Sequence, residues 1–153
     1  MRRAVLLIAL IAFGTTYGED QCKKIPPESV MKQAQPTAEE IMKKCMHLLD
    51  KYPVPLNVIG EALRVMCDDY AQCHDKLESL SKDPNKYRME IAKCTRPHLI
   101  NFCKSRPEIE HDPEKLADDI NNCILEHIPL DKSLGIATGV WVMKILGIPV
   151  EGA

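Results

Sequence analysis

Glycine is scarce in this chain of 153 residues, and its spacing excludes several common ligand-binding motifs. Seven glycines occur in the sequence, and none lies between Gly60 and Gly135. Phosphate-binding loops, dinucleotide-binding turns and EF-hand calcium loops all depend on glycines at fixed positions. The G-x-S-x-G motif of serine hydrolases and the H-E-x-x-H motif of zinc proteases are absent too. The sequence therefore contains none of these nucleotide, calcium or hydrolase motifs.

Excess positive charge and β-strand signals are also missing. The 20 Lys and Arg residues are outnumbered by 22 Asp and Glu residues, so the formal net charge is −2. Because nucleic-acid binders need a basic surface that displaces counterions from phosphates, we expect no nucleic-acid partner. Strand-like alternation and the Asn-Gly or Asp-Gly dipeptides of hairpins do not occur. The chain is therefore expected to be all-α.

The first eighteen residues have the features of a secretory signal peptide. A leader with two arginines precedes an apolar run over residues 4–13, and the small residues Thr16 and Gly18 lie at positions −3 and −1 of a cleavage point. The alternative is a membrane anchor, but this run covers only about half of a ~30 Å hydrocarbon core. We therefore expect a signal peptide over 1–18, secretion to the extracellular space, and a single all-α, disulfide-rich domain over 19–153.

Seven cysteines are spread through the expected mature chain. In an oxidising compartment they predict a disulfide framework. The alternative is a structural zinc site, but the sequence has no C-x2-C pair, so we expect no metal. Since seven is odd, one cysteine is left for a free thiol, a small-molecule cap or a covalent homodimer, and the pairing stays open. The candidates are Cys22, Cys45, Cys67, Cys73, Cys94, Cys103 and Cys123.

Prolines and helix-capping residues divide residues 19–153 into helical segments. The Thr37 capping box predicts that a helix starts just after Pro36. The pairs Asp83-Pro84 and Asp112-Pro113 each predict an N-cap followed by proline at the first helical position. Helices are expected to end or be limited at Pro36, Pro53, Pro97 and Pro129. The result is a compact bundle of about six or seven helices stapled by disulfides.

The strongest periodic signal is a seam of apolar side chains between Leu56 and Leu80. Its members recur at intervals of three and four residues, which predicts the buried face of a helix of about seven turns. Cys67 and Cys73, six positions apart, differ by about 120° around such a helix, so we expect them to bond to different partners. The seam contains Leu56, Ile59, Leu63, Met66, Tyr70, Cys73, Leu77 and Leu80.

The segment 134–150 is almost uncharged, with Lys144 as its one charged residue and Trp141 as the one tryptophan of the chain. A helix that is apolar nearly all round is buried in the core, lines a ligand cavity, or contacts a membrane or partner. Gly135 and Gly139 form a G-x-x-x-G pattern, which argues for close approach of another helix.

The sequence pairs no nucleophile with a base. The five histidines lie on different segments without the i, i+4 spacing of helical metal ligands. Cys73-His74-Asp75 invites comparison with secreted phospholipases A2, but the glycine-rich calcium loop of those enzymes is absent. We therefore expect a protein that is not an enzyme, with no catalytic residues and no cofactor.

The segment from Cys94 to Cys103 is a C-x8-C pattern in a chain with dispersed cysteines and proline-punctuated helices. This combination resembles arthropod secreted helical proteins of the odorant-binding type, including their seven-cysteine venom relatives. Cysteine-rich salivary proteins of blood-feeding arthropods look similar. The C-x3-C of the odorant-binding type is replaced by Cys67-x5-Cys73, and Cys123 follows the C-x8-C, so neither disulfides nor ligand residues carry over.

These features together predict a non-enzymatic extracellular protein that binds a small hydrophobic molecule in a helical cavity. Aliphatic and methionine side chains suit an adaptable pocket, although each is equally explained as ordinary core. The alternative is a secreted venom or salivary-type interaction protein or toxin that acts on an extracellular protein or a membrane through residues 134–150. The expected ligand-binding residues are Leu63, Met66, Tyr70, Trp141 and Met143.

Overall fold

The computed structural model describes residues 22–110 and 112–150, and the expected signal peptide over 1–18 lies outside them. This part of the chain is all-α and contains no strand. Two short helices lie in connections, α3 (His47–Lys51) and the 3-10 helix η1 (Glu78–Lys82). The five long helices are α2 (Glu28–Cys45), α4 (Leu56–Leu77), α5 (Pro84–Lys104), α6 (Pro113–Leu125) and α7 (Lys132–Ile145).

Two prolines that were expected to separate helices lie inside them. Pro36 is in α2 and Pro97 is in α5, so the described residues form five long helices instead of the six or seven expected. A proline inside a helix leaves the carbonyl four residues earlier without its partner, at a cost of about 3 kcal/mol. Both prolines are exposed, where water can reach that carbonyl, and buried side chains on either side keep each helix packed.

The two predicted aspartate caps are confirmed. Asp83 accepts a hydrogen bond from the Lys86 amide (3.3 Å), and Asp112 accepts one from the Glu114 amide (3.1 Å), each with proline at the start of the helix. These bonds satisfy amide groups that the first helical turn leaves without partners. The expected helix start at Thr37 is wrong, because α2 already runs through that position.

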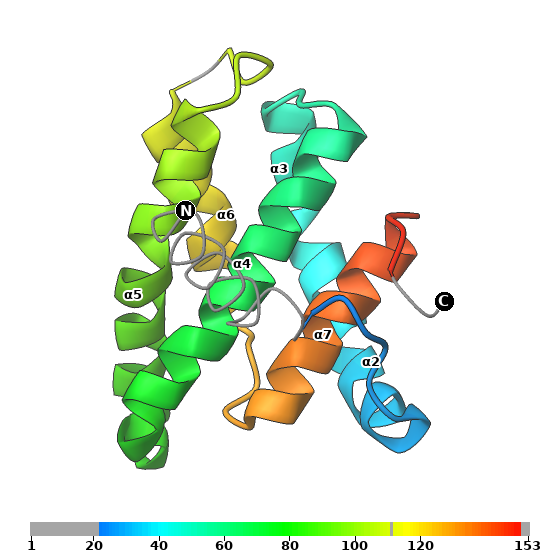
Figure 1. Ribbon diagram of the computed structural model, residues 1–153, viewed down its shortest axis with the longest axis vertical. Coiled ribbons are helices and arrows are strands. Elements are labelled where there is room, and N and C mark those ends of the chain that lie inside the picture. Colours follow the sequence, from blue (N-terminus) through cyan, green and yellow to red (C-terminus); the bar gives the residue numbers. More distant parts are fainter. Residues whose placement is uncertain (1–21, 111, 151–153) are drawn as a thin grey trace, which may run out of the picture.

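The five long helices form a closed ring (Figure 1). In order around the ring, α2 packs against α7, α7 against α4, α4 against α5, α5 against α6, and α6 back against α2. Each helix buries its apolar face toward the centre, as amphipathic helices do in a bundle. The arrangement surrounds an interior to which all five helices contribute.

The nearly uncharged segment at the end of the chain is a core helix followed by an extended tail. α7 packs between α2 and α4, and six of its fourteen residues are buried. α7 ends at Ile145, and Gly147 follows with a φ of +76°, a conformation that suits glycine. The Ile148 amide donates to the Met143 carbonyl (2.9 Å), which completes a Schellman motif. Within residues 22–110 and 112–150, no helix is both long and apolar enough to cross a membrane.

Three disulfides tie the ring together, and they are compatible with an extracellular protein. Cys22–Cys67 joins the N-terminal segment to α4, Cys45–Cys123 joins α2 to α6, and Cys73–Cys94 joins α4 to α5. Cys67 and Cys73 thus have different partners, as their spacing predicts. The odd cysteine is Cys103, whose thiol is free and buried.

Candidate functional site

The first cavity lies at the end of the ring where α2 meets α3 and where α4 begins. Its volume, measured as the space open to the centre of a water molecule, is about 60 Å³. All five long helices contribute aliphatic or sulfur-containing side chains to its walls, among them Ile41, Ala62, Cys103, Leu116 and Val142. The periodic apolar positions of α2, α4 and α6 converge here because each helix turns its hydrophobic face inward.

The first cavity reaches the protein surface near the junction of α2 and α3. Met46, which lies at this junction and lines the cavity, is 41% exposed. Met42, Leu49 and Ile59, which also line the cavity, are partly exposed. Methionine is flexible and adapts its shape to a neighbour, so two methionines at an opening suit a passage that must widen.

A hydrogen bond holds one wall of the first cavity in place. Tyr52 is the residue directly after α3, and its hydroxyl donates to Asp119 Oδ2 of α6 (2.6 Å). Lys51 Nζ lies 3.5 Å from the same oxygen. This hydrogen bond is the main cause that raises the pKa of Tyr52 and lowers the pKa of Asp119. The tyrosine ring lines the cavity, so the bond fixes the connection between α3 and α4 against α6.

The second cavity adjoins the first and lies closer to the middle of the bundle. Its volume by the same measure is about 40 Å³. Four aliphatic side chains line both cavities and form the wall between them: Ile41, Leu63, Ile124 and Val142. Side chains of this kind can change rotamer, so a flexible ligand could extend from one cavity into the other.

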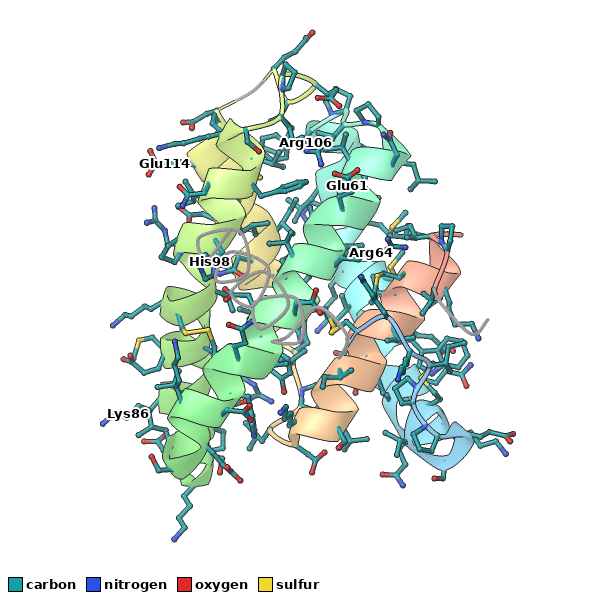
Figure 2. All side chains as sticks on the ribbon, viewed as in Figure 1. Glu61, Arg64, Lys86, His98, Arg106 and Glu114 are labelled. Atoms are coloured by element: carbon teal, nitrogen blue, oxygen red, sulfur yellow. A yellow bond between two sulfur atoms is a disulfide. The ribbon has the colours of Figure 1, made fainter. Side chains whose placement is uncertain are left out.

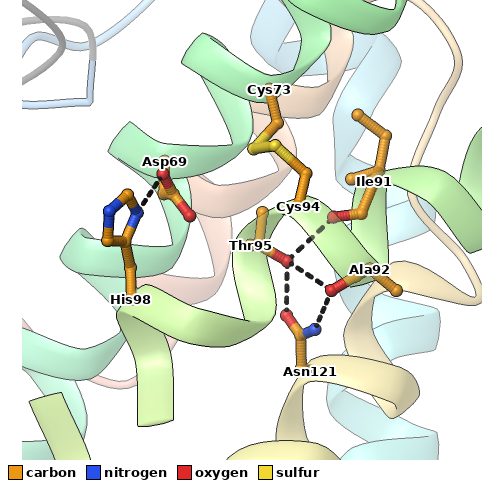
Figure 3. The surroundings of a disulfide bond; sticks show 8 residues. All are labelled: Asp69, Cys73, Ile91, Ala92, Cys94, Thr95, His98 and Asn121. Atoms are coloured by element: carbon orange, nitrogen blue, oxygen red, sulfur yellow. Dashed lines mark hydrogen bonds and ion pairs between the residues drawn. A yellow bond between two sulfur atoms is a disulfide. The ribbon is translucent and has the colours of Figure 1, made fainter. Parts of the chain in front are cut away.

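Polar side chains distinguish the second cavity from the first. Tyr70, Thr95, Asn121 and Thr138 line it, and all four are at least 97% buried. Thr95 Oγ1 lies 3.0 Å from both the Ile91 carbonyl and Asn121 Oδ1, and Asn121 Nδ2 donates to the Ala92 carbonyl (3.0 Å). Figure 3 shows these contacts between α5 and α6. The two residues therefore join α5 to α6 through a small buried network.

No charged side chain of the described residues lines either cavity. Figure 2 shows the charged side chains of Lys86 and Glu114 at α5 and α6, and both are exposed. Arg106, near the end of α5, forms an ion pair with Glu61 of α4. The interior thus offers apolar contact and a few neutral hydrogen-bonding groups.

Three of the five ligand-binding residues expected from the sequence lie at these cavities. Leu63 lines both, and Met66 and Tyr70 line the second. Trp141 and Met143 line neither, because both pack against α2. Trp141 Nε1 instead donates to the Met31 carbonyl of α2 (2.6 Å), and Met143 is fully buried between α2 and α7.

Several lining residues carry no distinguishing sequence signal. Ile41 and Ile124 occur in the helical pattern of apolar residues but look like any core position. Asn121 and Thr95 are polar residues in helix interiors, and sequence reasoning gave them no role. Asn121 of α6 bonds to Thr95 and to the Ala92 carbonyl of α5, so only the packing of α5 on α6 brings these polar groups together.

Two histidines form close polar pairs outside the cavities. His98 Nδ1 lies 2.6 Å from Asp69 Oδ1 (Figure 3), and His74 Nδ1 lies 2.5 Å from the Tyr87 hydroxyl. Burial raises the pKa of Asp69, and the hydrogen bond from His98 opposes that rise. In the part of the chain that the structure describes, no three His, Cys, Asp or Glu side chains are placed to hold a metal ion.

The chain was compared with protein families, curated proteins and solved structures. No family model, no curated protein and no solved structure matches the chain. The case for a function therefore rests on the geometry of the two cavities and on the disulfide-linked ring around them.

Proposed function

We propose that this protein is a secreted, non-enzymatic carrier that encloses a small hydrophobic molecule in the two adjoining cavities. The observation that carries the proposal is the first cavity, which has walls of aliphatic and sulfur-containing side chains, one tyrosine, and an opening at Met46. Apolar pockets with a few placed polar groups are the usual form of small-molecule sites.

The size of the cavities limits the ligand. A cavity needs about 10–15 Å³ of space open to the centre of a water molecule for each group of that size. The first cavity then accommodates roughly four to six such groups and the second roughly three or four. A chain or ring system of about eight carbon atoms would fill both, and a bulkier ligand would require the helices to move apart.

The disulfides support the carrier role because they hold the cavity walls without requiring a fully packed interior. Cys45 lines the first cavity and is joined to Cys123 of α6, and Cys67 lines the second cavity and is joined to Cys22. Cross-links of this kind stabilise a fold independently of packing. They also agree with the expected secretion into an oxidising compartment.

The rival proposal is a secreted interaction protein or toxin, as in venom or saliva. The exposure of Met46, Leu56, Met89 and Ile145, each between 41% and 54%, favours it. Against it, α7 is packed into the ring, and Ile145 is the only one of these four exposed side chains that lies in the segment 134–150. A covalent dimer through Cys103 would also require the bundle to open, because that cysteine is 3% exposed.

Native mass spectrometry of the protein secreted from eukaryotic cells tests the proposal. We expect an additional mass of roughly 100–200 Da, that of a ligand with about eight carbon atoms, which disappears on denaturation and leaves a non-reduced monomer. A ligand-free species at twice the monomer mass, stable until reduced, would instead support the interaction protein.

Displacement of an uncharged dye that fluoresces in apolar surroundings gives a second test. The variant Leu63→Phe enlarges the side chain between the two cavities and should weaken dye binding about tenfold, since overfilling an interior costs about 1–3 kcal/mol. Met89→Phe is the matched control, because Met89 is 54% exposed on α5 and lines neither cavity. Equal weakening in both variants, or no binding to the unmodified protein, would contradict the proposal.

A further inference from the structure

We propose that the ligand of this carrier is an uncharged amphiphile, with its alkyl part in the first cavity and an oxygen atom bound by the Asn121 amide in the second. This inference rests on the proposed function and specifies the chemical class of the ligand. It follows from the hydrogen-bonding capacity left free at Asn121 and from the absence of charge in the walls that the structure describes.

Asn121 has one donor that its protein partners do not use. Its side chain is 1% exposed. The Oδ1 atom lies 3.0 Å from Thr95 Oγ1, and Nδ2 donates to the Ala92 carbonyl, which accepts only and so fixes which end of the amide faces it. An amide nitrogen carries two hydrogens, and among the described residues only one of them has an acceptor. Buried donors are normally satisfied, so a ligand oxygen at this position would complete the network.

Thr95 can take part in the same interaction as an acceptor. Its one hydroxyl hydrogen is directed to the Ile91 carbonyl (3.0 Å), Asn121 Oδ1 (3.0 Å) or the Ala92 carbonyl (3.3 Å). The hydroxyl oxygen keeps lone pairs for a donor. An alcohol would therefore accept from Asn121 and donate to Thr95, and a ketone, aldehyde or ester would accept from Asn121 alone.

The rest of the lining selects against ionised head groups. Burying an unpaired carboxylate or ammonium group is costly, and neither cavity offers a charged side chain of the described residues as a partner. Asp69 is buried nearby in the chain, but it lines neither cavity and one of its oxygens is bound to His98. A neutral oxygen needs no such partner.

The first cavity suits the alkyl part because its polar atoms are committed or weak. The Tyr52 hydroxyl donates to Asp119, and Cys103 contributes a thiol, which is a poor hydrogen-bonding group. A polar head placed there would lose its hydrogen bonds to water without replacement. The two cavities therefore orient an amphiphile in one direction, with the carbon chain toward Met46.

Binding of matched eight-carbon compounds tests this inference. Octane, octan-1-ol, octan-2-one, octanoate and octylammonium would be compared by dye displacement at about pH 7, where the last two are ionised. We expect octan-1-ol and octan-2-one to bind at least tenfold more tightly than the two ions. Asn121→Leu should weaken octan-1-ol about tenfold and leave octane unchanged. Asn122→Leu is the matched control, because Asn122 is exposed on the same helix and lines neither cavity.

The outcomes separate this inference from the proposed function. If none of the compounds binds, the carrier proposal itself fails. If octanoate binds as tightly as octan-1-ol, or if Asn121→Leu and Asn122→Leu behave alike, the carrier stands and the inference is overturned. A measurement without variants covers the case in which Asn121→Leu does not fold. The carbonyl stretch of bound, isotope-labelled octan-2-one should shift to the frequency of a hydrogen-bonded ketone, and the frequency seen in hexane would overturn the inference.

Discussion

Gly135 of α7 lies directly against the phenol group of Tyr70 of α4, and a side chain at position 135 would overlap the tyrosine hydroxyl. One turn later, a Cβ at Gly139 would lie 3.0 Å from Cys67 Sγ. The G-x-x-x-G pattern therefore marks a close approach of two helices, as its spacing predicts. This contact also places the Tyr70 ring in the wall of the second cavity.

Gly135→Ala should destabilise the protein although alanine favours helices. The added methyl group displaces Tyr70, and overfilling a core costs about 1–3 kcal/mol. We expect this cost to outweigh the ~1 kcal/mol that alanine gains over glycine in helix propensity. Chemical denaturation of the oxidised protein measures the change. Gly139→Ala should lose less, because its Cβ meets one sulfur atom instead of a ring. A Gly135→Ala protein as stable as the unmodified one would show that the Tyr70 ring moves aside freely.

The hydrogen bond between Tyr52 and Asp119 should make stability depend on acid pH. Because the bond lowers the pKa of Asp119 in the folded protein, its contribution is present above the pKa of the unfolded carboxyl group and is lost as pH falls through the folded value. Tyr52→Phe keeps the ring in the cavity wall and removes the bond. We expect the variant to unfold at a lower temperature near neutral pH, with the difference shrinking below about pH 4.

Asp119→Asn is the companion variant to Tyr52→Phe. It should remove the same pH-dependent difference, and the double variant should add little to either single change, since all three lack the same ionised hydrogen bond. Thermal unfolding of the four proteins across acid pH measures this. Fully additive effects would mean that the two residues stabilise the protein independently.

Cys103 should be the one thiol that reacts after unfolding, and it should be nearly inert before. Burial raises its pKa from 9.0 to about 11, so the reactive thiolate is about a hundredfold less abundant near pH 8. Alkylation by iodoacetamide should therefore be at least that much slower in the folded protein than in denaturant. Peptide mapping identifies the labelled residue. Rapid labelling of Cys103 in the folded protein would contradict its burial, and labelling at another cysteine would contradict the disulfide arrangement.

Because Cys103 lines the first cavity, its reactivity also reports on the ligand. A bound molecule should slow alkylation of the folded protein further, since it occupies the space through which the reagent would enter. The Leu63→Phe variant should show less protection at the same ligand concentration. Protection that is equal in the two proteins would place the ligand elsewhere.

The Cys45–Cys123 disulfide should contribute more stability than Cys73–Cys94. Their sequence separations are 78 and 21 residues, and the chain-entropy relation gives about 4.5 and about 3.3 kcal/mol for loops of these lengths. Replacing each pair by alanine and measuring unfolding with denaturant tests the order. The first replacement should also speed ligand release, because Cys45 lines the first cavity. The opposite order of stability would show that native contacts outweigh loop length.

Local chemistry explains which parts of the fold were predictable from the sequence. The caps at Asp83 and Asp112 and the separate partners of Cys67 and Cys73 depend on residues within one or two helical turns. The predicted seam is fully buried only in its middle, at Met66, Tyr70 and Cys73, whereas Leu56 is 50% exposed. The helix count was wrong because breaks at Pro36 and Pro97 were inferred from local cost alone. Burial of side chains on both sides of each proline outweighs that cost, and burial is a tertiary property.

The sequence by itself determined an all-α protein with one cysteine left over, because helical periodicity and cysteine number are local or countable properties. It also predicted Leu63, Met66 and Tyr70 as cavity residues, and these three line the cavities because they share one face of a single helix. Only the tertiary structure decided that Cys103 is the free thiol, that Trp141 and Met143 face away from the cavities, and that Asn121 enters one. Each of these depends on how α5, α6 and α7 rotate against their neighbours, and that rotation is set by packing across the whole ring.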